Sequence, residues 1–308
     1  MIVKLVRVYS LIRYVSAILA IAFFTLLERK ILGYRQLRKG PNKVRIIGFL
    51  QPFADAIKLF TKEVILLKKS NIITFLVAPG GRLFFNLILW SLFPFFNQPL
   101  FLRFRVLIFI CVSGIRVYFI ILAGWTSNSK YALLGRMRRL AQIISYEVRI
   151  IFIIISLASL AHTFSFTHFI QNKTLILFTL FPIFIPWIIS ILAETNRAPF
   201  DLPEGEAELV SGFNVEYGGG LFALIFIAEY SNVLIFRVVT CVFFLSPINL
   251  ILSSVLVALR TLWIRATLPI IRYDQLMYMA WKCFLPVSIS FLLFSILFIC
   301  LDNFKLQT

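Results

Sequence analysis

The sequence predicts an all-α membrane protein of about eight transmembrane helices, with polar loops on one side and an interfacial amphipathic helix. Of the 308 residues, 60% are hydrophobic and only 14% are charged, whereas soluble domains carry about 25% charged residues. The mean hydropathy is +0.94. Apolar runs of about 20 residues, the length that crosses a bilayer, recur along the chain. We therefore expect residues 1–308 to form a single integral membrane domain.

Each expected span is an apolar run bounded by polar residues. The eight runs cover residues 2–27, 72–96, 103–126, 142–165, 174–194, 217–240, 242–263 and 281–301. The boundary between the sixth and seventh runs is the least defined, because almost nothing polar separates them. The first run begins at Ile2 and no small-residue cleavage site follows it, so we expect a retained span and not a signal peptide.

The distribution of charge predicts an orientation. Eight crossings place the first, third, fifth and seventh loops on one side, and two of them hold a large share of the basic residues: Arg29, Lys30, Arg35, Arg38, Lys39, Lys43, Arg45, Lys58, Lys62, Lys68, Lys69, Lys130, Arg136, Arg138 and Arg139. By the positive-inside rule, this is the matrix or cytoplasmic side. The net charge of +18 would suggest nucleic acid in a soluble protein, but here the basic residues lie between spans, so we expect no nucleic-acid binding.

The residue types that hold metals and redox groups are sparse. The four cysteines are far apart and form no CxxC motif, and the two histidines, His162 and His168, lie close together at one expected loop. Neither pattern supplies the ligands of a zinc site or an iron–sulfur cluster. We expect no metal site and no redox centre in this chain.

The first polar loop, Glu28 to Glu63, predicts an interfacial helix. It reads ERKILGYRQLRKGPNKVRIIGFLQPFADAIKLFTKE, with a turn expected at Gly40-Pro41-Asn42. Pro52 suits a helix start, and apolar and charged residues then alternate at helical spacing over 53–62, as in helices that lie in a membrane interface. On its own, this pattern equally fits a basic helix bound to lipid head groups.

Acidic residues are concentrated in the fifth loop and its neighbouring spans. The loop AETNRAPFDLPEGEAELVSGFNVEYGGG, residues 193–220, contains six acids: Glu194, Asp201, Glu204, Glu206, Glu208 and Glu216. Carboxylates packed this closely repel one another, so we expect some to have raised pKa values and to share protons. This property suits a proton relay, whereas the alternative is a solvated acidic loop.

Two further acids lie inside expected spans. Glu147 is near the start of the fourth span, and Glu229 is about 12 residues into the sixth, roughly 18 Å deep. A carboxylate at that depth is costly and usually functional. The alternative is a neutral glutamate hydrogen-bonded to a neighbouring helix.

Two long segments carry a family resemblance. GPNKV…LQPFADAIKLFTKE and LAETNRAPFDLPEGEAELVSGFNVEY closely resemble the signature segments of the subunit 1 family of NADH:ubiquinone oxidoreductase, respiratory complex I. Two weaker matches, YALLG…AQIISYEV and RYDQLMYMAWKCFLP, follow in the family's order. The resemblance implies eight helices at the joint between the membrane and peripheral arms. It also implies a mitochondrial inner-membrane location, with the polar loops facing the matrix.

The resemblance also implies roles for individual residues. A polar proton path would include Asp55, Glu147, Glu194, Asp201, Glu204, Glu206, Glu208, Glu216 and Glu229. The wall of a quinone channel would include Glu28, Arg29, Arg38, Arg197, Phe200, Arg272 and Asp274. Ubiquinone would be the substrate, while FMN and iron–sulfur clusters would belong to partner subunits. The other expected partners are the membrane-arm and quinone-site subunits of the complex and phospholipid.

Several arginines depart from the family pattern. Arg116, Arg149 and Arg237 lie inside expected spans, and Arg7 and Arg13 interrupt the first. Each is costly unless it is paired or reaches the interface. Either these arginines pair with acids or lipid phosphates, or AGA and AGG codons that many invertebrate mitochondria read as serine have been translated as arginine. The family also usually has an apolar residue at Arg35 and often has a basic one at Ile270, whereas Arg38, Arg272 and Asp274 match.

Other classes of protein remain as alternatives. A proton or cation antiporter acting alone would use Glu229 as its carrier, but such transporters usually show two related halves, and this sequence has no internal repeat. The membrane subunit of a related hydrogenase-type complex is less well separated by the motifs. A purely structural anchor for a peripheral arm would tolerate neutralisation of the acids.

Overall fold

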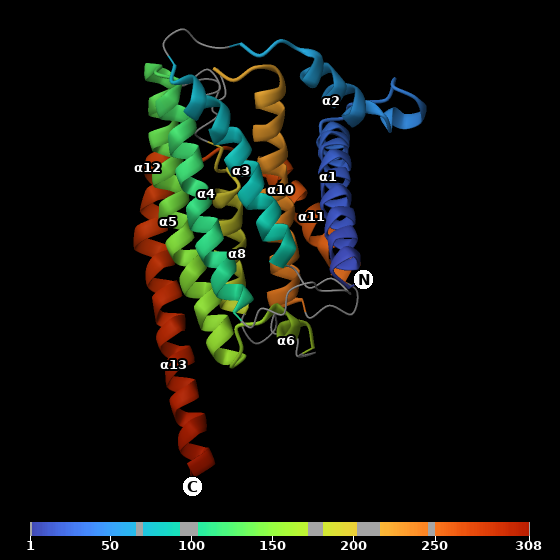
Figure 1. Cartoon of the computed structure of the whole chain (residues 1–308). Helices are drawn as coiled ribbons and strands as arrows, with labels where there is room; N and C mark the ends of the chain where they lie inside the picture. The colour runs from blue at the N-terminus through green and yellow to red at the C-terminus, as the bar shows by residue number, and fades with distance from the viewer. Residues whose placement is uncertain are drawn as a thin grey trace.

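A computed structural model describes residues 2–65, 70–92, 104–171, 181–201, 216–245 and 250–307, and all the regular secondary structure in this part of the chain is helical (Figure 1). The elements are α1 (Ile2–Arg35), η1 (Ile46–Gly48), α2 (Gln51–Thr61), α3 (Ile72–Leu92), α4 (Arg105–Thr126), α5 (Lys130–Leu160), α6 (Phe166–Gln171), α8 (Phe181–Glu194), α10 (Gly219–Phe244), α11 (Leu250–Thr267), α12 (Tyr273–Tyr278), η3 (Met279–Phe284) and α13 (Leu285–Gln307). The segment η3 is a π-helical turn that joins α12 to α13.

The predicted fold class is confirmed. Within the described residues, seven helices are long and apolar enough to cross a membrane: α1 from Val8, α3, α4, α5, α10, α11 and the continuous helix from Tyr273. The remaining expected span, the fifth, at 174–194, corresponds to α8, which is apolar and has 14 described residues.

Several expected boundaries were wrong, including the following three. The helix α1 continues past residue 27 to Arg35, and α5 begins at Lys130 and not at 142. Residues 130–141 therefore belong to a helix, and Arg136 and Arg139, which we expected in a loop, are buried on it. The predicted break at 241 is also absent, because α10 continues through its apolar residues to Phe244. At residues 27 and 142 we placed the span boundary at polar residues. Polar residues do not end a helix that has good helix formers on both sides.

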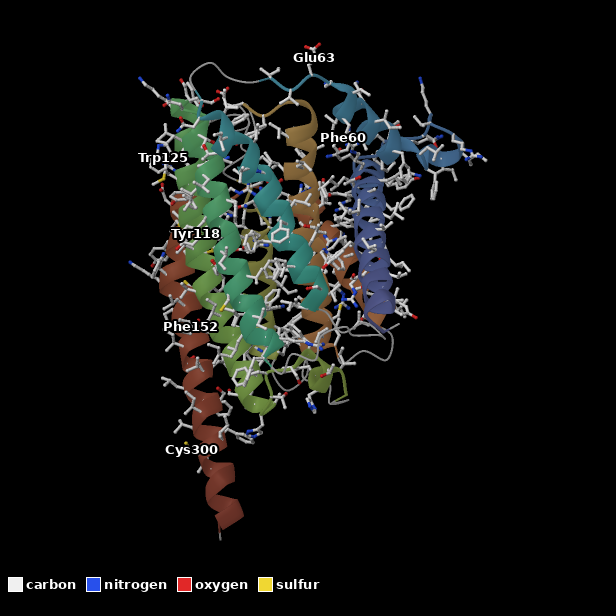
Figure 2. All side chains as sticks on the ribbon, viewed as in Figure 1. Phe60, Glu63, Tyr118, Trp125, Phe152 and Cys300 are labelled. Atoms are coloured by element: carbon white, nitrogen blue, oxygen red, sulfur yellow. The ribbon has the colours of Figure 1, made fainter. Side chains whose placement is uncertain are left out.

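The helices form a bundle in which α10 is central (Figure 1). It packs against α1, α2, α3, α6 and α11. Aromatic side chains of α4 and α8 also contact α10, and α5 packs against α4 and α8. The helix α13 packs along α5, and the part of it that carries Cys300 extends beyond the rest of the bundle (Figure 2). The helix α2 lies at the opposite end of the molecule.

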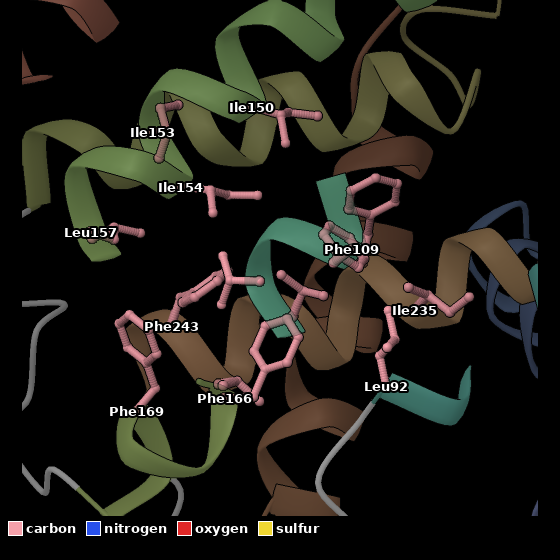
Figure 3. Packing of buried hydrophobic residues seen from close by; sticks show 14 of the residues in the cluster. Leu92, Phe109, Ile150, Ile153, Ile154, Leu157, Phe166, Phe169, Ile235 and Phe243 are labelled. Atoms are coloured by element: carbon pink, nitrogen blue, oxygen red, sulfur yellow. The ribbon is translucent and has the colours of Figure 1, made fainter. Parts of the chain in front are cut away.

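The largest hydrophobic core joins α4, α5, α6, α8 and α10 (Figure 3). Trp187 and Phe243 are completely buried in it, and Phe243 meets the ring of Phe169 edge to face at 4.9 Å. Phe109 meets Phe166 in the same way, at 6.2 Å. Aromatic rings in these geometries attract one another in addition to burying area. The core therefore holds together the end of the bundle that lies away from α2.

The predicted helix after the first span is present as α2. It begins at Gln51 and Pro52 as expected, and none of its residues is buried. Phe23 of α1 packs against Phe53 at 5.9 Å between ring centroids. Figure 2 shows Phe60 and Glu63 at this end of the molecule, with the Glu63 side chain directed away from the bundle. Location in a membrane interface remains a prediction for α2.

The packing of α3 on α4 depends on one glycine. A Cβ atom at Gly81 would lie 2.2 Å from Cε1 of Phe119, whereas a Cβ at the adjacent Gly80 would meet nothing within 4 Å. Small residues permit close helix packing in membranes.

We expect Gly81→Leu to destabilise the protein by about 1–3 kcal/mol through overpacking, and Gly80→Leu to have little effect. The fraction that stays soluble after heating detergent-solubilised membranes measures both, and equal loss for the two variants would contradict the packing argument.

Candidate functional site

Five helices contribute buried charged side chains to one polar cluster. These are Arg82 of α3, Arg116 of α4, Arg139 of α5, Glu194 of α8 and Glu229 of α10, each less than a tenth exposed. Together with Thr195 and Asn232, they line one small polar space between the helices. Charges enclosed within a helical bundle are costly unless paired, so the pairing determines whether this cluster is stable.

Glu229 is held by two arginines. Its Oε1 accepts hydrogen bonds from Nη1 of Arg82 at 3.1 Å and from Nη2 of Arg139 at 2.9 Å. From the sequence we expected Arg139 in a loop and did not single out Arg82. The lone charge within the apolar run 72–96 was the signal that would have found it.

Glu194 is held by a third arginine. Its Oε1 accepts a hydrogen bond from Nη2 of Arg116 at 2.8 Å, and Nη1 of Arg116 donates to Asn232 and, at 3.4 Å, to Asn86. Asn86 in turn donates to the carbonyl of Ala228 at 2.6 Å, on the turn that precedes Glu229. Arg116, which is out of place in an apolar span, is therefore paired. The two asparagines were missed because amides within spans gave no pattern of their own.

Glu147 lies beside this cluster, half-buried on α5. A Cβ atom at Gly114 of α4 would be 3.6 Å from its Oε1. Counting Glu147, the three arginines face three carboxylates. The predicted acids Glu147, Glu194 and Glu229 are thus brought together in the bundle, in near-balance with basic partners.

A second buried group forms around Glu28 of α1. This carboxylate is only 4% exposed; it forms an ion pair with Arg265 of α11, and Nη1 of Arg197 lies 3.9 Å from it. All three line one small cavity, together with Thr195, Arg237 and apolar residues that include Phe24. Two residues expected in a quinone channel, Glu28 and Arg197, therefore share one cavity. Arg265 was missed because it follows the expected end of the seventh span.

The two cavities adjoin at Thr195. This residue lines both the space around Glu194 and Glu229 and the space around Glu28 and Arg197. Its hydroxyl donates to the carbonyl of Ile191 at 2.9 Å, which fixes it on the last turn of α8. The end of α8 therefore stands between a carboxylate cluster and a mixed cationic and apolar cavity.

The remaining expected channel residues lie elsewhere. Arg29 pairs with Asp55 of α2 at 2.6 Å, and Arg29 and Arg38 line an open pocket with Lys39. Arg272 and Asp274 are strongly exposed and pair with each other at 3.1 Å.

A buried amide holds the segment that leads into the acidic loop. Nε2 of Gln142 donates to the carbonyl of Ala193 at 2.9 Å and to that of Phe200 at 3.0 Å. The backbone N–H of Ile271 donates to Pro199 at 3.0 Å. Phe200 is thus buried, and Asp201 follows it at the edge of the described residues. Glu216 begins the next described segment, and Glu204, Glu206 and Glu208 lie outside the described residues.

The other unusual arginines differ in their surroundings. Arg13 is buried and donates to the carbonyl of Ser91 at 3.3 Å, and the side chain of Arg7 lies outside the described part. Arg149 stacks on Tyr146 at 3.5 Å, but neither of its terminal nitrogens meets a hydrogen-bond partner among the described residues. The same holds for Nη1 of Arg237, whose guanidinium lies over Phe24 at 4.1 Å.

Comparison with known proteins identifies similar sequences over nearly the whole chain. A family model described as NADH dehydrogenase matches residues 8–296. NADH-ubiquinone oxidoreductase chain 1 of Anopheles gambiae is 47% identical over 291 residues, which cover 92% of this chain and 93% of that protein. The chain 1 proteins of Branchiostoma lanceolatum and Monodelphis domestica are 47% and 45% identical, over 95% and 91% of this chain and 95% and 92% of their own.

The two arginines with unmet terminal nitrogens give a direct test of the codon explanation. We expect serine at both positions of the natural protein, because a buried guanidinium with unmet donors is costly and a serine is not. Trypsin should then leave the protein uncut after residues 149 and 237. Peptide mass spectrometry of a denatured digest reads both positions, with cleavage after the exposed Arg272 as the control. Cleavage after 149 and 237 would establish genuine arginines at these positions.

Proposed function

The chain belongs to the family of NADH-ubiquinone oxidoreductase chain 1, and from this premise we propose that it helps to form the quinone channel of that complex and couples quinone reduction to proton translocation. It is a membrane subunit of a complex, so its partners include other subunits. The family membership favours this function over a stand-alone antiporter or a hydrogenase-type subunit.

The observation that carries the proposal is the shared wall at Thr195. The cavity around Glu28 and Arg197 combines apolar side chains, such as Phe24 and Leu262, with charged ones, as suits an apolar ligand that has a polar head. The neighbouring cavity holds Glu194 and Glu229. Substrate chemistry in the first cavity can therefore change the electrostatic field in the second over a short, poorly solvated distance.

The chemistry requires such a connection. Reduction of a quinone consumes protons and transiently creates negative charge, while the electrons come from FMN and iron–sulfur clusters in partner subunits. Negative charge near Arg197 would compete for its guanidinium and alter the field at Glu194, three residues away along the chain. The ion pairs of Glu194 and Glu229 would then change protonation or partner, which is the coupling between sites that proton translocation needs.

Two acids outside the described residues belong to the same proposed path. We infer that Glu204 and Glu206 pass the signal from the channel towards Glu194 and Glu229, with the polar loops facing the matrix and phospholipid around the spans. Asp55, Asp201, Glu208 and Glu216 would complete the acidic side of the path. Arg29, Arg38, Phe200, Arg272 and Asp274 would extend the channel wall.

Neutralising the two loop acids tests the path. We expect Glu204→Gln combined with Glu206→Gln to abolish most proton pumping and to slow quinone reduction, because coupled carboxylates lose their shared protons. Both activities are measured in inverted membrane vesicles, with Glu63→Gln, an exposed carboxylate, as the control. Parent values for both activities in the double variant would refute the assignment.

The residue between the cavities tests the connection itself. We expect Thr195→Val to leave the rate of quinone reduction near that of the parent but to lower the number of protons pumped per electron by about a factor of two or more. The change removes a hydroxyl that, among the described residues, is the one polar group lining both cavities. The matched control is Thr261→Val, because Thr261 lines only the cavity around Glu28. An unchanged ratio in Thr195→Val would contradict the proposed connection.

A further inference from the structure

Glu28 faces two arginines, and the two are held differently. Arg265 forms the close ion pair with the Glu28 carboxylate, whereas Nη1 of Arg197 is 3.9 Å from it. The Arg197 guanidinium instead lies over the ring of Tyr230, 4.4 Å from its centroid. Arg265 is thus the main counter-charge of Glu28, and the Tyr230 ring helps to fix Arg197.

We propose that Arg265 is a positioning residue of the quinone channel, which neutralises Glu28 and thereby keeps Arg197 over Tyr230 and against the cavity. The proposal rests on the proposed channel role of Glu28 and Arg197. Arg265 itself comes from α11, a helix with only four buried residues: Val257, Ala258, Thr261 and Leu262. Its ion pair with α1 therefore also joins a sparsely packed helix to the cavity wall.

Removal of Arg265 has a defined consequence in this geometry. Glu28 would be left buried with one cation at 3.9 Å, and an uncompensated buried carboxylate is strongly unfavourable. The carboxylate would draw Arg197 into hydrogen-bonding distance and away from Tyr230. The cavity wall would change shape and lose the Arg197 guanidinium, so quinone would bind less well while the electron-transfer step itself is untouched.

The first measurement compares two arginines of α11 in the assembled complex. We expect Arg265→Gln to raise the KM for a short-chain quinone about tenfold, the middle of the range spanned by coupling between contacting residues, with little change in kcat. Oxidation of NADH by ferricyanide should keep its parent rate. Arg260→Gln is the matched control, because Arg260 is an exposed arginine of the same helix, and we expect it to keep the parent KM.

A double variant separates positioning from simple attachment of α11. If Arg265 acts by neutralising Glu28, Glu28→Gln with Arg265→Gln should have a lower KM than Arg265→Gln alone and the same KM as Glu28→Gln. If Arg265 only attaches α11 to α1, removing both partners cannot lower the KM. A double variant with a KM equal to or above that of Arg265→Gln therefore overturns the proposal. If Arg265→Gln fails to assemble, the double variant is compared with Glu28→Gln instead, and a KM above that of Glu28→Gln overturns the proposal.

Arg197→Gln distinguishes this inference from the proposed function. An unchanged quinone KM in Arg197→Gln would refute the channel itself and the inference with it. A raised KM in Arg197→Gln with a parent KM in Arg265→Gln would refute only the role of Arg265.

Discussion

The pairing of charges inside an apolar bundle is the constraint on which the rest of this structure depends. Glu229 lies deep in α10, and its carboxylate is stable there because Arg82 and Arg139 approach it from two other helices. Each of these contacts fixes the rotation of a helix as well as its position, since a helix that turned by one residue would lose its partner. Hydrophobic packing alone would allow several rotations of such uniformly apolar helices. The ion pairs select one of them.

The end of α8 and the turn after it connect the two groups of buried charges. Within four consecutive residues, Glu194 belongs to the carboxylate cluster, Thr195 lines both cavities and Arg197 reaches the cavity around Glu28. Glu194 ends α8, and Thr195 and Arg197 belong to the tight turn that follows it, so a displacement at one of these residues also moves the others. The fully buried Gln142 strengthens this arrangement by bonding the carbonyls on both sides of the turn.

The sequence predicted the class of fold and the number of spans because both follow from composition and the length of apolar runs. It also predicted Glu28, Arg197, Glu194 and Glu229 as site residues, and the structure brings these into two adjoining cavities. It did not predict Arg82 or Arg265 as their partners, since pairing between α3 and α10 or between α1 and α11 depends on which helices become neighbours. It misplaced Arg139 because a basic residue near a span end reads as a loop residue, although the helix α5 continues through it.

The contact between Arg82 and Glu229 joins residues that are 147 positions apart in the chain. During synthesis, Arg82 enters the membrane well before Glu229 exists, and Arg139 precedes Glu229 by 90 positions. The early helices therefore insert as a cationic intermediate whose counter-charge has not yet been made. The ion pairs that join α3 and α5 to α10 are therefore completed only when Glu229 enters the membrane.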